Sequence, residues 1–218
     1  MIISKLVLGI GVNISRQERV LSLLKKRIRS SQKTLVVSLN PEMAVLACKE
    51  PEFKAIIDRA DLVIPDGAGI VWALRRQGVK VERLTGTDLM LALIKLKHKT
   101  LLVGGREGVA EAAAKKLGVL ALGEPNVAKI NKIKPDLLFV ALGHGKQERW
   151  LAENLPRLNV KLAMGVGGAL DQIAKPWLRA PKFLQNLGLE WLYRLILQPW
   201  RLKRQLALIK FIWYARAE

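Results

Sequence analysis

The stretch DLLFVALGHGK at residues 136–146 decides how this sequence folds. It begins with an aspartate and then carries six apolar residues in a row, which is typical of a strand buried on both faces. Gly143 and Gly145 then allow the chain to turn sharply, and a helical pattern begins at Lys146. A buried strand, a glycine turn and a helix together form the repeating unit of a parallel α/β sheet.

The same unit recurs along the chain. Apolar or β-branched runs predict strands at 34–39, 62–64, 100–103 and 160–164, and residues 6–12 form a further strand or buried segment. Helices are predicted over 15–31, from 40–42, over 68–76 and 87–96, after 104–105 up to 117, and from 146, with Asn40 and Thr87 as N-caps. This alternation predicts an α/β fold with a mostly parallel sheet flanked by helices.

The composition is that of a globular protein with an excess of positive charge. The 218 residues include 37 Lys and Arg against 18 Asp and Glu, a formal net charge of +19. Such an excess suggests an anionic partner, which could be nucleic acid, an anionic membrane surface or a phosphorylated substrate. The single cysteine, Cys48, excludes an intramolecular disulfide, and we expect it to be a buried small apolar residue.

The sequence predicts a cytoplasmic protein. The apolar run at 6–12 is followed by no small-residue cleavage site, so it is a poor signal peptide. No uninterrupted apolar stretch approaches the roughly 20 residues that are needed to span a bilayer. The chain changes character near residue 175, and we expect two parts: an α/β core at 1–175 and a helical, basic and aromatic appendage at 176–218.

The appendage combines arginines with tryptophan and leucine. We expect one helix at 184–197 and a second from Pro199 toward Trp213. If the helix is continuous, Arg194, Arg201 and Arg204 share one face. A helix with arginines on one side and apolar residues on the other suits a membrane interface. The alternative is that the apolar residues pack on the core and the arginines are solvated.

Several common motifs are incomplete in this sequence. The glycines at 9–11 and at 165–167 lack the third glycine of a dinucleotide-binding loop, and Gly145-Lys146 lacks the Ser or Thr of a phosphate loop. Two histidines and one cysteine nearly exclude a His/Cys zinc site, and there is no Asp-x-Asp pair for a divalent ion. If a sugar nucleotide binds, arginines and backbone N–H groups must therefore neutralise its charge.

Polar residues gather where the predicted strands end. They are Ser38, Asn40, Asp66, the residues at 85–88 and 146–148, and Asp171. In open α/β sheets ligands bind beyond the carboxyl ends of the strands. Asp66 follows an apolar strand and a proline, and a carboxylate held there could act as a general base. The alternative is that Asn40 and Thr87 are helix caps and that Asp66 is a turn residue.

Four stretches form a composite pattern. They are SLNPE at 38–42, ADLVIPDGAGIV at 60–71, ERLTGTDL at 82–89, and a discontinuous set over 140–194 with VALG, KQE, GVGG, Asp171, RAP and GLEWLYR. On these residues the sequence resembles the WecG/TagA/CpsF family of glycosyltransferases, from about residue 36 to the C-terminus. The long composite pattern is more specific than any single glycine motif.

The resemblance implies a fold and an activity. It implies a Rossmann-like α/β domain with a C-terminal, membrane-associating appendage, peripheral on the cytoplasmic face of the cell membrane. Members of the family transfer a sugar, such as N-acetylmannosamine or its uronic acid, from a UDP-sugar to a polyprenyl-diphosphate-linked N-acetylglucosamine. They invert the anomeric configuration and need no metal, so we expect no cofactor. A homo-oligomer is compatible with this family.

The resemblance also implies roles for single residues. Asp66 is the expected general base, Ser38 stands where the family usually has Thr, and Asn40 is expected to bind donor or acceptor near the base. The residues expected to bind the nucleotide, its diphosphate or the sugar are Arg83, Gly143, Gln147, Gly167, Asp171, Arg194, Arg201 and Arg204.

The sequence departs from the family pattern in three places. Gly143-His144-Gly145-Lys146 replaces the usual Gly-Ala-Pro-Lys. The segment 118–134 is shorter than in typical members, which carry a further strand and helix there, so we expect less material at this edge of the sheet. Lys175-Pro176 replaces a glycine that follows the Asp171 region.

Two other functions fit parts of the sequence. The charge of +19 would suit a nucleic-acid-binding protein, although no recognised nucleic-acid-binding module is visible and basic and aromatic residues alternate only in the tail. A sugar-nucleotide-binding protein without catalytic activity is the second alternative, because the loop at 143–146 is altered.

Overall fold

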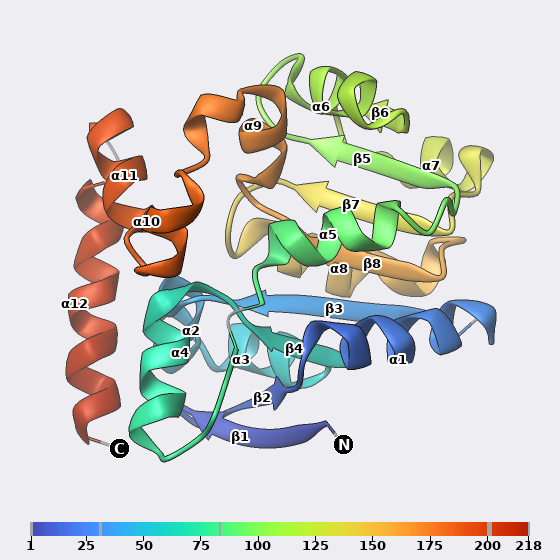
Figure 1. Cartoon of the computed structure of the whole chain (residues 1–218). Helices are drawn as coiled ribbons and strands as arrows, with labels where there is room; N and C mark the ends of the chain where they lie inside the picture. The colour runs from blue at the N-terminus through green and yellow to red at the C-terminus, as the bar shows by residue number, and fades with distance from the viewer. Residues whose placement is uncertain (1, 31, 83, 200–201, 218) are drawn as a thin grey trace.

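The computed structural model describes residues 2–30, 32–82, 84–199 and 202–217. Its centre is a six-stranded sheet with the strand order β4-β3-β8-β7-β5-β6, and all neighbouring strands are parallel (Figure 1). The strands are β3 (Thr34–Leu39), β4 (Leu62–Pro65), β5 (Thr100–Gly104), β6 (Leu120–Leu122), β7 (Leu137–Ala141) and β8 (Leu162–Gly165). The predicted α/β fold with a parallel sheet is confirmed.

Helices cover both faces of the sheet. Alternate strand residues point to opposite faces, so Val36 and Phe139 pack on one side while Val37 and Leu138 pack on the other. The first face is covered by α1 (Gln17–Arg29), α5 (Gly86–Ile94), α6 (Val109–Leu117) and α9 (Ala169–Ala174). The second is covered by α2 (Pro41–Lys49), α3 (Pro51–Asp58), α7 (Val127–Ile133) and α8 (Lys146–Asn154). The strands of this sheet are therefore buried between two helical layers, except for the edge strand β6, which is partly exposed.

An antiparallel hairpin precedes the sheet. The predicted single segment at 6–12 is instead β1 (Ile3–Val7) and β2 (Ile10–Ile14), because Leu8 and Gly9 take positive φ angles and reverse the chain. The side-chain oxygen of Asn13 accepts a hydrogen bond of 2.8 Å from the backbone N–H of Val63. This bond fastens the hairpin beside the edge strand β4.

The helix caps confirm one prediction and correct another. Asn40 caps α2, and its side chain accepts from the N–H of Met43. Thr85, not Thr87, caps α5, with Oγ1 accepting a 3.0 Å hydrogen bond from the N–H of Asp88. The hydroxyl of Thr87 lies within the helix and donates to Gln172 instead.

The short segment 118–134 contains strand β6 and helix α7, because three strand residues suffice to pair with β5. That it carries less material than in typical members stays a prediction, whereas another prediction is wrong. Cys48 is exposed rather than buried. It lies in the last turn of α2, on the exposed side of the helix. The buried residues of this helix are Met43, Ala44, Val45 and Ala47.

The C-terminal segment consists of α10 (Lys182–Asn186), α11 (Glu190–Leu197) and α12 (Leu202–Ala217). The helix predicted at 184–197 is interrupted because Gly188 takes a left-handed φ of +74°, where a Cβ would lie 3.1 Å from Ala68. A second break follows α11 at Gln198. Arg194 and the backbone of Arg204 therefore belong to different helices, so the continuous helix on which a shared arginine face depended does not form.

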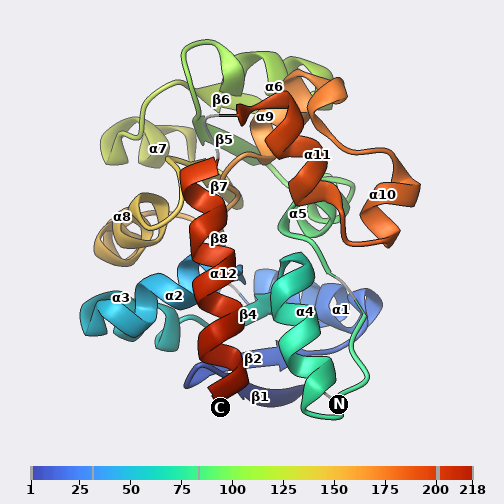
Figure 2. The same cartoon turned by 90° about the vertical axis from the view of Figure 1, so that its left-hand side faces the viewer.

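Helix α12 packs against the core. It crosses the carboxyl edge of the sheet and contacts α2 and α4 (Gly67–Arg76), as Figures 1 and 2 show. Phe211 is completely buried in this contact, and Gly69 lets α12 approach, since a Cβ there would lie 3.3 Å from Leu208. The boundary predicted at residue 175 stays a prediction.

Much of the C-terminal segment presents apolar side chains to solvent. The exposed large residues are Trp177, Phe183, Leu187, Trp191, Leu192, Ile196, Leu197, Leu202, Leu206, Ile209 and Trp213. Among the described residues, no helix combines the length and hydropathy that crossing a bilayer requires.

We expect Phe211→Ala to lower the free energy of unfolding by about 3–5 kcal/mol, because it empties a fully buried aromatic site. Ile209→Ala, on the same helix and 65% exposed, is the matched control and should change it by less than about 0.5 kcal/mol. Urea unfolding followed by circular dichroism measures both. Equal effects of the two variants would show that α12 does not dock through Phe211.

Candidate active site

A cavity of about 590 Å³ opens at the carboxyl edge of the sheet. Its walls come from the ends of β3, β4, β5, β7 and β8 and from the C-terminal helices. Helices α2, α4, α8 and α9 begin there with their N-termini, which carry partial positive charge. An edge with several helix N-termini favours an anionic ligand, and the volume of the cavity suits a small molecule.

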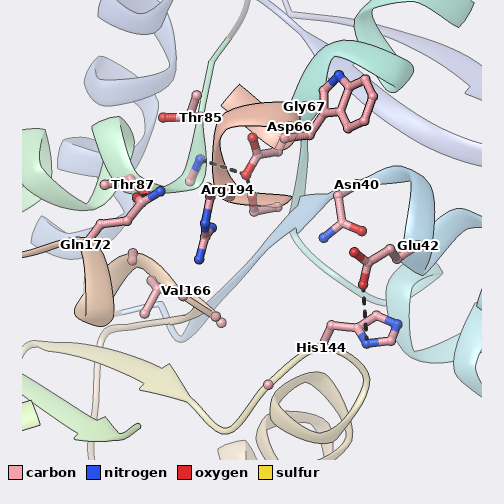
Figure 3. A pocket seen from close by; sticks show the side chains of 18 of the residues that line it. Asn40, Glu42, Asp66, Gly67, Thr85, Thr87, His144, Val166, Gln172 and Arg194 are labelled. Atoms are coloured by element: carbon pink, nitrogen blue, oxygen red, sulfur yellow. Dashed lines mark hydrogen bonds and ion pairs between the residues drawn. The ribbon is translucent and has the colours of Figure 1, made fainter. Parts of the chain in front are cut away.

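Asp66 lies on the wall of this cavity, immediately after β4 (Figure 3). Its Oδ2 accepts a 2.6 Å hydrogen bond from the hydroxyl of Ser38 and a 3.1 Å hydrogen bond from the N–H of Gly86. These bonds come from two different elements, β3 and the start of α5, and they fix the orientation of the carboxylate. Residue 86 must be glycine, since a Cβ would lie 2.6 Å from the Ser38 hydroxyl.

Asn40 lies on the same wall, beside Asp66 in Figure 3. Its capping bond to Met43 holds the side chain at the rim of the cavity. The structure thus brings together Ser38, Asn40 and Asp66, as predicted. It places them within reach of one ligand.

Gln147 and Glu148 form a buried pair beneath two glycine loops. The Gln147 amide oxygen accepts from the N–H of Gly167 at 3.0 Å, and its nitrogen donates to Glu148 at 2.7 Å. The other carboxylate oxygen of Glu148 accepts from the N–H of Gly145 at 2.7 Å. Gln147 was predicted to contact the ligand, and it lines the cavity. In addition, it shapes the loops that form the cavity wall.

Glu148 is a residue that the sequence places at a strand end but to which no role was assigned. Burial raises the pKa of its carboxyl group, although its bonds to Gln147 and Gly145 act in the opposite direction. The local signals were its place in the polar group 146–148 after a predicted strand and its place beside Gln147 in the composite pattern. Because it is 3% exposed, it supports the site from below and does not face the cavity mouth.

Arg194 enters the cavity from helix α11 (Figure 3). Its guanidinium lies over Gly168, where a Cβ would come within 2.7 Å of Nη2. Gly143, Gly167 and Asp171 also line the cavity, and the two glycines take positive φ angles of 86° and 49°. Sequence reasoning did not single out Arg106, a second cation on the cavity wall.

Three predicted arginines are not placed at the site. Arg83 and Arg201 lie outside the described residues, and so does the side chain of Arg204. Their predicted contact with a diphosphate stays a prediction.

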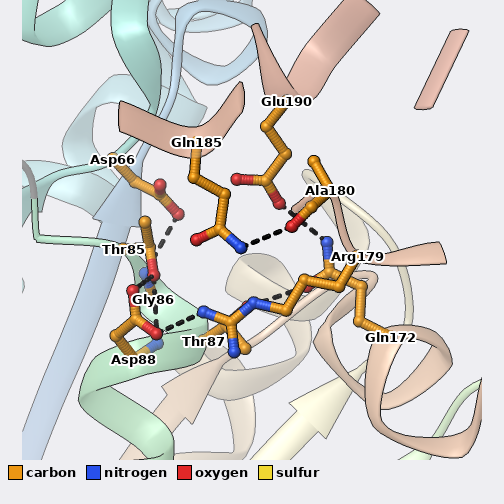
Figure 4. Close-up of polar contacts among 10 residues, drawn as sticks. All are labelled: Asp66, Thr85, Gly86, Thr87, Asp88, Gln172, Arg179, Ala180, Gln185 and Glu190. Carbon is orange, nitrogen blue, oxygen red and sulfur yellow. Dashed lines mark hydrogen bonds and ion pairs between the residues drawn. The ribbon is translucent and has the colours of Figure 1, made fainter. Parts of the chain in front are cut away.

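A network of polar contacts joins the C-terminal segment to the core (Figure 4). Arg179 pairs with Asp88, which also accepts a 2.6 Å hydrogen bond from Thr85. Gln172 on α9 donates to Glu190 at the start of α11 at 2.9 Å. The segment that leads to Arg194 is therefore fastened to the same turn of α5 that holds Asp66.

Across the described ranges, no group of three or more His, Cys, Asp or Glu side chains is placed to hold a metal ion.

The cavity brings the fixed carboxylate of Asp66 together with two arginines, Arg106 and Arg194, a combination that suits group transfer from an anionic substrate. The family described as "Glycosyl transferase WecG/TagA/CpsF family" matches residues 6–218. The chain therefore belongs to this family and is a glycosyltransferase, as the resemblance predicted.

Two relatives make the likeness more specific. A protein of Bacillus subtilis (strain 168) is 30% identical over 196 residues, which cover 81% of this chain and 77% of the relative. A protein of Staphylococcus aureus (strain MRSA252) is 31% identical over 195 residues, with the same coverage. Both are N-acetylglucosaminyldiphosphoundecaprenol N-acetyl-beta-D-mannosaminyltransferases.

We expect Glu148→Gln to lower the free energy of unfolding by about 1–3 kcal/mol, because an amide N–H₂ must then face another donor, either Gly145 N–H or Gln147. Glu153→Gln, on the exposed face of the same helix, is the control. Chemical denaturation of both variants measures the difference. A Glu148→Gln protein as stable as the wild type would contradict the buried pair.

We expect Arg179→Ala to loosen the C-terminal segment without unfolding the core. The pair with Asp88 is partly exposed, so global stability should fall by less than about 1 kcal/mol. Chymotryptic cleavage between residues 177 and 191 should become about threefold to fivefold faster. Lys182→Ala, an exposed cation in the same segment, is the control. Equal cleavage rates in the two variants would rule out this fastening role.

Proposed function

We propose that this glycosyltransferase moves an N-acetylmannosamine-type sugar from a UDP-sugar to a polyprenyl-diphosphate-linked N-acetylglucosamine, with inversion and without a metal ion. The names of the two relatives support the transferred sugar and the acceptor. The cavity supports the reaction, because it offers the oriented carboxylate of Asp66 and the two arginines Arg106 and Arg194 to the same ligand.

The observation that carries the proposal is the fixed carboxylate of Asp66. In the proposed step an acceptor hydroxyl oxygen attacks the anomeric carbon of the donor, and its proton passes to Asp66. The bond from that carbon to the β-phosphate oxygen breaks, and UDP leaves with the electron pair. Attack opposite the leaving group inverts the configuration in one displacement. Ser38 and Gly86 keep Asp66 oriented during the step.

The leaving diphosphate needs positive charge, and the cavity supplies it. Arg194 and Arg106 line the cavity, and the loops at Gly143 and Gly167 let a phosphate approach backbone N–H groups. Fixed donors of this kind stabilise charge that develops in the transition state. Asp171 suits the ribose hydroxyls, a common pairing in nucleotide sites.

The C-terminal helices fit an acceptor that is held in a membrane. Exposed side chains such as Trp177, Trp191 and Trp213 lie on the same segment that supplies Arg194 to the cavity. Aromatic and aliphatic side chains of this kind bind at the bilayer interface, and the net charge of +19 favours an anionic leaflet. We therefore place the protein peripherally on the cytoplasmic face of the cell membrane.

Transfer from a panel of UDP-sugars to a short-chain polyprenyl-diphosphate-GlcNAc, with EDTA present, tests this function. We expect wild-type transfer with one N-acetylhexosamine donor, and a loss of roughly 10²-fold or more in Asp66→Asn, which keeps the shape but cannot take the proton. Asp58→Asn, an exposed aspartate on α3, is the control and should keep full activity. UDP binding by calorimetry should be similar in all three proteins.

Three outcomes would contradict the proposal. Full transfer by Asp66→Asn would show that Asp66 is not the general base. Loss of transfer in EDTA, restored by added Mg²⁺, would show that the reaction needs a metal ion. A wild-type protein that binds no UDP would show that the donor is not a UDP-sugar.

A further inference from the structure

The cavity has a polar end that the proposed chemistry does not yet use. His144 and Glu42 face each other there, on the wall next to Asn40 (Figure 3). The His144 Nδ1 lies 3.9 Å from the Glu42 Oε2. Both side chains line the cavity, and they are 32% and 24% exposed, so a ligand in the cavity can reach them.

The loop that carries His144 has a shape that glycine dictates. Gly143 and Gly145 flank the histidine with φ angles of 86° and 78°, which L-residues rarely adopt. Gly145 also packs against α2, since a Cβ there would lie 3.2 Å from Leu46. Its N–H is held by the buried Glu148. The loop is therefore anchored on both sides, and it holds the imidazole across from the first turn of α2.

The chemistry of the pair fits a sugar. An imidazole and a carboxylate together offer hydrogen-bond donors and acceptors a few ångströms apart, which match the vicinal hydroxyls of a hexose. Asn40, whose side-chain amide lies at the same wall, adds a further polar group. A nucleobase or a diphosphate would instead prefer an aromatic face or cations.

The position of the pair indicates that it binds the acceptor sugar and not the donor sugar. Arg194, Arg106 and Asp171 belong to the other part of the wall, around Gly168 and α9, which suits the nucleotide and its diphosphate. In Figure 3 Asp66 lies at the top of the cavity, with Arg194 below it and with Asn40, Glu42 and His144 to its right. The hydroxyl that gives its proton to Asp66 belongs to the acceptor, so the ring that bears it extends beyond Asp66, away from the diphosphate.

We propose that His144 and Glu42 form a subsite that binds hydroxyl groups of the acceptor sugar and thereby selects the acceptor. This inference rests on the proposed function for the direction of the reaction, because that function makes Asp66 the base. It assigns a role to a histidine that two glycines of left-handed conformation hold at the cavity wall.

The test compares the transfer kinetics of wild type and of His144 variants, with the concentration of each substrate varied in turn. We expect His144→Ala to raise the KM for the polyprenyl-diphosphate-GlcNAc acceptor roughly tenfold, with the KM for the donor changed less than twofold. His144→Gln keeps a side-chain N–H and should recover most of the loss. His98→Ala is the matched control, because this second histidine pairs with Asp136 outside the cavity and should leave both KM values unchanged.

A binding measurement separates this inference from the proposed function. Calorimetric titration of the same acceptor into wild type and His144→Ala, without donor, should show roughly tenfold weaker binding in the variant. One outcome is that the wild type shows no transfer activity while this difference in acceptor binding still appears. In that case the proposed function fails and the subsite stands. A raised donor KM with an unchanged acceptor KM overturns the subsite, and so does unchanged acceptor affinity or a wild type that does not bind the acceptor.

Discussion

The parallel alignment of the six strands is the constraint on which the rest of the structure depends. Because all strands of this sheet run the same way, the carboxyl ends of five of them meet at one edge of the sheet and line the cavity. Helices begin at the same edge, with their free N–H groups directed toward the cavity. An antiparallel sheet would have divided these ends between two edges. The alignment thus creates the electropositive edge before any charged side chain is added.

Close backbone approach then turns this edge into a site. Gly86 lets β3 and α5 come near enough for Ser38 and a backbone N–H to hold the same oxygen of Asp66. Gly168 makes the corresponding room for Arg194. A side chain at either position would collide with the group that it now accommodates. The buried carboxylate of Glu148 supports this arrangement by bonding the N–H of Gly145 and, through Gln147, that of Gly167.

The C-terminal segment completes the site and is tied to it. The pair between Arg179 and Asp88 and the bond between Gln172 and Glu190 connect this segment to α5 and α9. Since α5 also holds Asp66 through Gly86, Asp66 and the arginine of α11 rest on one connected framework. The exposed tryptophans of the segment therefore lie on the same unit as a cation of the cavity, which is a suitable arrangement for a substrate with a charged head and a lipid tail.

The sequence by itself determined five of the six strands of the parallel sheet, the fold class and the family. Local patterns were sufficient for the strand at 34–39, for the cap at Asn40 and for the convergence of Ser38 with Asp66, because each depends on neighbours in the chain or on the carboxyl-edge rule. Only the tertiary structure decided that Leu8 and Gly9 reverse the chain, that Gly188 divides the tail, and that Asp88 meets a residue 91 positions away. A left-handed residue or a contact between distant segments is stabilised by packing elsewhere in the molecule, and no local pattern carries that information.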